Sequence, residues 1–149
     1  MNKFYLLAIV AFILVSCSKK SSPAPTGTAL SVTGKWYLTA DTLKEYQNGV
    51  LKSTTVENDP AAYFQFNSDL SGSQFTGATL SKLTYKLGTN NVVLTWPTQV
   101  DSKGNPIDMF SETATIRKAT TTDLILYFED TSTGNGITYK TTEVVYLRK

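Results

Sequence analysis

The stretch "LTYKLGTNNVVLTW", residues 83–96, contains two alternating runs of apolar and polar residues with a polar break between them. Leu83, Tyr85 and Leu87 alternate with polar residues before the break, and Leu94 and Trp96 do so after it. Strict alternation over a few residues predicts a strand with one buried face. The break, Gly-Thr-Asn-Asn, has the composition of a tight turn. The stretch therefore predicts an antiparallel hairpin.

The same alternation recurs along the chain from residue 34 onward, which predicts eight or nine short antiparallel strands. Asn48-Gly49 suits a two-residue hairpin turn, because both positions accept a positive φ. We expect an all-β protein whose long meander closes as an up-and-down barrel, since closure removes exposed edges; a β-sandwich is the alternative. The polar segments 44–60 and 97–109 are interpreted as long loops. Besides the hairpin, the alternating segments are 34–41, 62–68, 112–118, 123–130 and 139–149.

The amino-terminal residues have the layout of an export signal. Lys3 precedes the apolar run 4–15, which is too short to span a bilayer but fits the core of a signal peptide. The four residues 14–17, Leu-Val-Ser-Cys, resemble the bacterial lipobox, and the resemblance implies lipidation of Cys17 and cleavage before it. Residues 1–16 are then a lipoprotein signal peptide, 17–29 a lipidated, flexible tether, and 30–149 the folded domain.

Composition excludes several kinds of chemistry. The 149 residues contain no histidine and one cysteine, which excludes Ser-His-Asp and Cys-His machinery and the usual zinc sites from the folded domain. Removing Lys3 with the signal peptide leaves 13 basic and 12 acidic groups, and the bases are scattered, so no nucleic-acid partner is expected. We expect no cofactor, no metal and no enzymatic activity.

Carboxylates are the remaining catalytic candidates. We interpret them as solvated groups, because they lie mostly at predicted strand ends and in polar loops. A hydrolase would need two carboxylates facing each other across a cleft, about 5–10 Å apart. The loop Asp101–Pro106 has calcium-like Asp, Gly and Asn residues but lacks the ligand alternation of an EF-hand, so a plain turn is expected. The candidate carboxylates are Asp41, Glu45, Asp101, Asp108, Glu112, Glu129 and Asp130.

Gly34-Lys35-Trp36 resembles the Gly-x-Trp motif that opens the first strand of lipocalins. Together with the lipobox, the tether and the order of the later strands, it resembles the small lipocalin-like lipoproteins of Bacteroidetes over nearly all of residues 30–149. The Thr-Asp-Tyr motif and the carboxyl-terminal helix of larger lipocalins are missing, which implies a minimal barrel. The resemblance implies that Trp36 closes one end of the barrel beneath a basic residue of the last strand, and Arg148 is the matching position.

The predicted inner face is rich in aromatic residues, which fill a small barrel or leave room for one small ligand. Trp96 and Tyr85 are the stronger ligand candidates, because each adds a hydrogen-bonding group. Tyr127 and Tyr146 are expected outside, and the last strand is ambiguous, since Val144, Tyr146 and Arg148 compete with Val145 and Leu147 for the inner face. The predicted interior is Trp36, Phe64, Phe66, Tyr85, Leu94, Trp96, Ile116, Leu126 and Phe128; seven of these, without Trp36 and Ile116, are the candidate ligand-binding residues.

The sequence thus predicts a lipid-anchored protein of the cell envelope that binds a small apolar ligand without altering it. The alternative is an interaction module with a filled barrel, whose long loops dock an envelope protein. Ser18 after the cysteine resembles the pattern of outer-membrane lipoproteins. Lys19 and Lys20, in place of acidic residues, favour a periplasm-facing orientation over surface exposure.

Overall fold

The structure is a computed structural model that describes residues 31–149. Nine antiparallel strands make up these residues, and among them no helix could cross a bilayer. The predicted signal peptide, the predicted lipidation site Cys17 and the predicted tether lie outside the described residues. The strands are β1 (Gly34–Gln47), β2 (Val50–Glu57), β3 (Tyr63–Phe66), β4 (Ser71–Phe75), β5 (Leu80–Leu87), β6 (Asn91–Val100), β7 (Pro106–Ala119), β8 (Asp123–Gly134) and β9 (Ile137–Arg148).

Eight of the strands form a closed ring, so the protein is an up-and-down β-barrel and not a sandwich. The ring runs β1-β3-β4-β5-β6-β7-β8-β9 and closes because β1 also pairs with β9. The ninth strand, β2, pairs with the second half of β1, whose first half pairs with β3. The ring and its buried core lie within residues 31–149, so a chain that begins at Ser18 carries the whole barrel.

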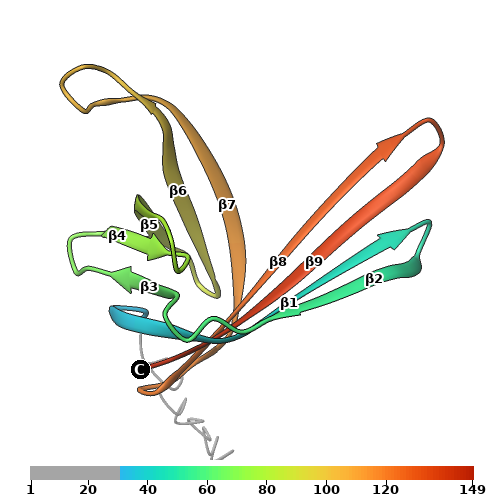
Figure 1. Ribbon diagram of the computed structural model, residues 1–149, viewed down its shortest axis with the longest axis horizontal. Coiled ribbons are helices and arrows are strands. Elements are labelled where there is room, and N and C mark those ends of the chain that lie inside the picture. Colours follow the sequence, from blue (N-terminus) through green and yellow to red (C-terminus); the bar gives the residue numbers. More distant parts are fainter. Residues whose placement is uncertain (1–30) are drawn as a thin grey trace, which may run out of the picture.

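The barrel is closed at one end and splits into two arms at the other (Figure 1). One arm is the hairpin β6–β7, and the other is a four-stranded sheet in the order β2-β1-β9-β8. Strands β7 and β8 are paired only from Thr115 to Ala119 and from Leu124 to Tyr127, and beyond this they diverge.

The arms correct the expectation of long loops at residues 44–60 and 97–109. Both segments are mostly strand. Polar side chains fit strands here because these parts of the arms have no buried face, and most of their side chains are exposed. The same lack of alternation hides β2 and β4, neither of which is among the alternating segments of the sequence.

Tight turns connect neighbouring strands within the four-stranded arm, as the sequence predicted for Asn48-Gly49. Asn48 and Gly49 have φ values of 50° and 79°, and Asn135 and Gly136 repeat this geometry between β8 and β9 with 52° and 74°. Two consecutive positive φ values match the twist of the flanking strands. In the Asp101–Pro106 loop, the Asp101 carboxylate accepts hydrogen bonds from the backbone N–H groups of Lys103 and Asn105 and from the Asn105 side chain.

The closed end is a well-packed plug around Trp36. Its ring is fully buried, and its Nε1 donates a 2.6 Å hydrogen bond to the carbonyl of Val32. The cation over this ring is Lys149, with its Nζ 4.4 Å from the ring centroid, and not Arg148 as expected. Val145 and Leu147 take the inner face of β9, so Arg148 alternates outward and pairs with Asp123. Tyr146 is exposed on the outer face as predicted, and Tyr127 shares that face.

A bulge in β1 changes which side chains face inward. Leu38 pairs with Leu147, but the next paired residue is Ala40, opposite the outward Tyr146. One extra residue, Thr39, therefore reverses the alternation. Uninterrupted alternation over the predicted segment 34–41 would place Ala40 on the face of Trp36 and Leu38. That expectation is wrong for Ala40, and Asp41, which pairs with the buried Val145, turns inward instead.

Candidate functional site

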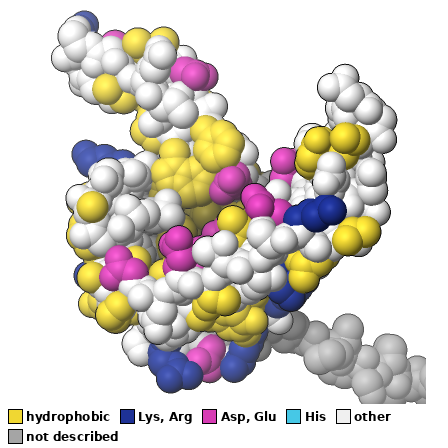
Figure 2. All heavy atoms as spheres, turned by 45° about the vertical axis from the view of Figure 1, so that its right-hand side comes forward, with side chains coloured by type: hydrophobic (Ala, Val, Ile, Leu, Met, Phe, Trp, Pro, Cys, Tyr) yellow, Lys and Arg dark blue, Asp and Glu magenta, His cyan; other side chains and the backbone are white. Residues whose placement is uncertain are grey.

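The open end of the barrel contains a cavity of about 430 Å³ between the two arms. Figure 2 shows it as a hollow with hydrophobic side chains on its floor and acidic groups beside them. A second hollow of about 410 Å³ lies where β7 and β8 diverge and shares Phe110, Glu112, Phe128 and Glu143 with the first. The divergence of the arms thus opens the barrel interior from the top and from the side.

The floor and one wall of the cavity are apolar. Phe64 and Val145 belong to the buried core and also line the cavity, as does Leu38, which packs against that core. Trp96 of β6 stacks on Phe110 of β7, with ring centroids 6.0 Å apart and planes inclined by 30°. Trp96 is partly buried against the core while Phe110 is half-exposed, so this stacked pair forms a wall that continues from the core into solvent.

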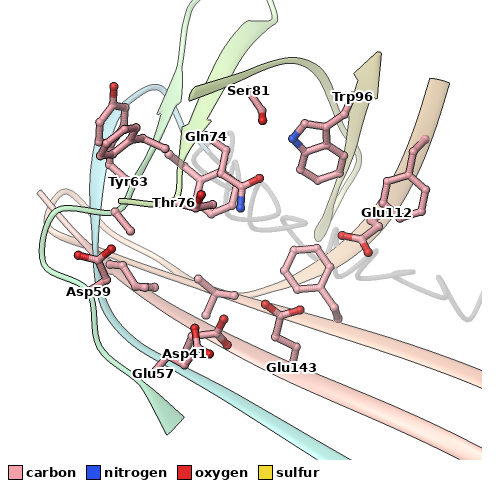
Figure 3. Close-up of a pocket in the computed structure, with 17 residues that line it drawn as sticks. Asp41, Glu57, Asp59, Tyr63, Gln74, Thr76, Ser81, Trp96, Glu112 and Glu143 are labelled. Atoms are coloured by element: carbon pink, nitrogen blue, oxygen red, sulfur yellow. The ribbon is translucent and has the colours of Figure 1, made fainter. Parts of the chain in front are cut away.

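Among residues 31–149, five carboxylates complete the lining of the cavity, and no lysine or arginine accompanies them. They come from separate parts of the chain, and Figure 3 shows Asp41, Glu57 and Glu143 on one side with Glu112 across from them. Asp41 reaches the cavity because of the β1 bulge, and Glu143 because it shares a face with Val145. The five are Asp41 (β1), Glu57 (β2), Asp59 (after β2), Glu112 (β7) and Glu143 (β9).

Asp41 and Glu143 form a hydrogen-bonded carboxyl pair. Burial raises the pKa of Glu143 to about 8, with further contributions from the nearby charge of Asp41 and from the hydrogen bond between the two side chains. Burial also raises the pKa of Asp41, although accepting the hydrogen bond from Glu143 opposes the rise. At neutral pH the pair therefore shares one proton, which Glu143 donates to the Asp41 carboxylate.

Two further features show that burial in the cavity leaves polar groups in an unfavourable environment. Burial, together with the charge of Asp130, raises the pKa of Glu112. Oδ1 of Asp41 and Nε1 of Trp96 are buried atoms that have no hydrogen-bond partner among residues 31–149. A buried polar atom without a partner costs about 1–3 kcal/mol, and such atoms are uncommon in folded proteins.

The seven predicted ligand-binding residues divide into two groups. Trp96, Phe64 and Phe128 line the cavity. The other four are buried in the core below it, where the Tyr85 hydroxyl, offered as a ligand contact, donates a 2.7 Å hydrogen bond to the carbonyl of Asn67. These four are Tyr85, Phe66, Leu94 and Leu126.

The interpretation of the carboxylates as solvated groups is wrong for Asp41 and Glu112, which are half-buried in the cavity wall. Glu143 was missed, although it precedes Val145 and Leu147 in the same alternation. Glu57 and Asp59 carry no sequence signal, because the unexpected pairing of β2 with β1 brings them to the cavity. Among residues 31–149, no group of three or more acidic side chains is placed to hold a metal ion.

Comparisons with protein-family models, with curated proteins and with solved structures found no match to this chain.

Proposed function

We propose that this protein is a lipid-anchored, lipocalin-like binding protein of the bacterial cell envelope, which holds a small molecule in the cavity at its open end without altering it. The observation that carries the proposal is the cavity itself. It has the volume of a small-molecule site, and it combines apolar walls with a few polar groups that could orient a guest. The mouth of a β-barrel is a common position for such a site.

Non-catalytic binding fits the carboxyl pair better than hydrolysis does. Asp41 and Glu143 are hydrogen-bonded directly to each other. A pair of carboxyl groups that hydrolyses a glycosidic bond needs room for the sugar, or for sugar and water, between its members. We therefore assign the pair to ligand recognition.

Native mass spectrometry of residues 18–149, purified from cells that make the protein, tests the binding function. We expect a stoichiometric small molecule that organic extraction removes and that Trp96→Ala abolishes, because Trp96 forms a wall of the cavity. Ile107→Ala is the matched control, since its side chain is 65% exposed on the β6–β7 arm and does not line the cavity. A clean apo mass that persists after incubation with envelope extract would contradict the function.

The proposal of a lipid anchor rests on the lipobox, and a separate experiment tests it. We expect the full chain to fractionate with membranes and to carry lipid on Cys17, while Cys17→Ser leaves the protein out of the membrane fraction. Two or more acyl chains bind a membrane stably, so the shift should be nearly complete. Membrane retention of the Cys17→Ser protein would contradict lipidation as the anchor. Protease accessibility in intact cells then separates the periplasm-facing orientation that we propose from surface exposure.

The β6–β7 arm favours a second candidate function, docking to an envelope protein. Val100, Ile107 and Met109 on this arm are 54%, 65% and 62% exposed. Contiguous exposed apolar side chains often mark an interaction site. Crosslinking in cells through the tip of the arm should then capture one partner, and substituting Ser at these three positions should abolish the capture.

A further inference from the structure

We propose that the ligand of this cavity is an organic cation. It carries one positively charged nitrogen that lies among the five carboxylates, and an apolar body that packs against Trp96, Phe110 and Phe128. The inference rests on the proposed function and names the chemical class of the ligand.

The charges that line the cavity are all of one sign. Among the described residues, the ion pairs are Lys118 with Asp123, Lys140 with Glu129 and Arg148 with Asp123, and none of these lies in the cavity. The five carboxylates of the lining therefore have no basic partner within the described part of the chain. An anionic guest would be repelled, whereas a cation would supply the missing countercharge.

The unpartnered atoms indicate, independently of the charge, that something polar belongs in the cavity. Oδ1 of Asp41 is a buried acceptor without a donor, and Nε1 of Trp96 is a buried donor without an acceptor. Asp41 and Trp96 lie on different walls (Figure 3). A protonated nitrogen that bears hydrogen would satisfy Asp41, and a hydroxyl or carbonyl oxygen elsewhere on the same molecule would satisfy Trp96.

The geometry favours an organic cation over a metal ion. The carboxylates come from β1, β2, β7, β9 and the connection after β2, and in the described part of the chain no three of them are close enough to hold a metal ion. Six aromatic side chains line the same cavity, Trp96, Phe110 and Phe128 among them, and aromatic faces attract organic cations. The volume of about 430 Å³ accommodates a molecule of this kind with an apolar body.

Binding of a cation should be coupled to a proton. The titratable groups that face the Asp41–Glu143 pair are Glu57 from β2 and Glu112 from β7, with Asp59 beside them and Asp130 of β8 acting on Glu112. All are acidic, so nothing in this set offsets a bound cation. A cation favours the ionised form of Glu143, whose pKa in the free protein is about 8. Binding at neutral pH should therefore release a proton, and affinity should increase as the pH rises through about 8.

Isothermal titration calorimetry of residues 18–149 with three phenyl probes tests the inference. The probes are 2-phenylethylammonium, which stays largely protonated up to pH 9 and carries N–H groups, the neutral 2-phenylethanol and the anion 3-phenylpropanoate. We expect the cation to bind at least about tenfold more tightly than the alcohol, with no binding of the anion. From pH 6.5 to 9 its affinity should increase severalfold, and at pH 7 its binding enthalpy should depend on the buffer because a proton is released.

Two variants test which carboxylates are responsible for the affinity for the cation. Asp41→Asn with Glu143→Gln removes the charge of the pair while keeping its shape, and should reduce the affinity for the cation about tenfold and abolish the proton release. Glu45→Gln removes one charge from β1 at an exposed position outside the cavity lining, and should change the affinity less than about twofold.

The outcomes separate this inference from the proposed function. Binding of the alcohol or the anion as tightly as the cation, or more tightly, would show that the ligand is not an organic cation and would leave the proposed binding function intact. Failure of all three probes, while envelope extract still delivers a stoichiometric ligand that is not cationic, would do the same. Failure of the probes together with a clean apo mass after extract would overturn both.

Discussion

The two ends of this barrel are built from the same strands but satisfy their polar groups to different degrees. At the closed end, Nε1 of Trp36 donates to the carbonyl of Val32, and the Tyr85 hydroxyl donates to that of Asn67. At the open end, the indole nitrogen of Trp96 and one buried oxygen of the Asp41 carboxyl have no hydrogen-bond partner in the part of the chain that the structure describes.

This difference separates stability from function. A buried polar group is tolerated when it is paired and costs free energy when it is not, so the closed end stabilises the fold while the open end retains groups that a guest could pair. The following predictions test this separation by perturbing matching residues of the two ends.

The two tryptophans provide the largest contrast. Trp36→Ala should reduce the free energy of unfolding by about 3–5 kcal/mol, because it empties a fully buried site and removes a paired N–H. Trp96→Ala should reduce it by about 1–2 kcal/mol, since this ring is partly exposed and its N–H has no partner. Urea unfolding of both variants measures the difference, and equal losses would mean that the two ends do not differ in this way.

The carboxyl pair gives the second contrast, because it should make the open end sensitive to pH. The pKa of Glu143 in the folded protein, about 8, lies above its ordinary value of 4.5, so the folded state binds more protons than the unfolded state between these values. Stability should therefore fall as the pH rises from about 4.5 to about 8 and level off above that.

Glu143→Gln removes this titration. At pH 9 the variant should be more stable than the wild type by about 1–2 kcal/mol, well below the full value of the pKa shift because the side chain is partly exposed to water. Thermal unfolding from pH 5 to pH 9 measures the slope. Glu45→Gln, exposed on β1, is the control and should keep the wild-type profile, and a Glu143→Gln profile with the same slope would contradict the assignment.

The closed end was largely predictable from the sequence, and the open end was not. Alternation identified the inner face of the barrel, and all nine predicted interior residues lie there, with Trp96 and Phe128 partly buried. Alternation reports burial, so it reports nothing where both faces of a strand are exposed, as in β2, and it fails where a bulge reverses it, as at Thr39. The arms and the inward turn of Asp41 depend on pairing between distant strands, which no local pattern specifies.

A smaller contrast tests whether the paired hydroxyl of Tyr85 contributes to the closed end. Tyr85→Phe leaves the carbonyl of Asn67 without this donor and should cost about 0.5–1.5 kcal/mol of unfolding free energy. Tyr146→Phe, on the exposed outer face of β9, is the matched control and should change stability by less than about 0.5 kcal/mol. Equal effects in urea unfolding would show that the hydrogen bond does not contribute.

The smallest contrast lies within the last two residues, and it decides which cation closes the barrel. Lys149 lies over the Trp36 ring and also donates from Nζ to the carbonyl of Thr33 at 3.0 Å, so Lys149→Met should cost about 0.5–1 kcal/mol. Arg148→Met removes only an exposed ion pair with Asp123 and should cost less than about 0.5 kcal/mol. The fluorescence of Trp36 should respond to the first variant and not to the second, read in a Trp96→Phe background that leaves one tryptophan. The reverse result would restore Arg148, the position that the lipocalin resemblance indicated, as the residue that closes the barrel.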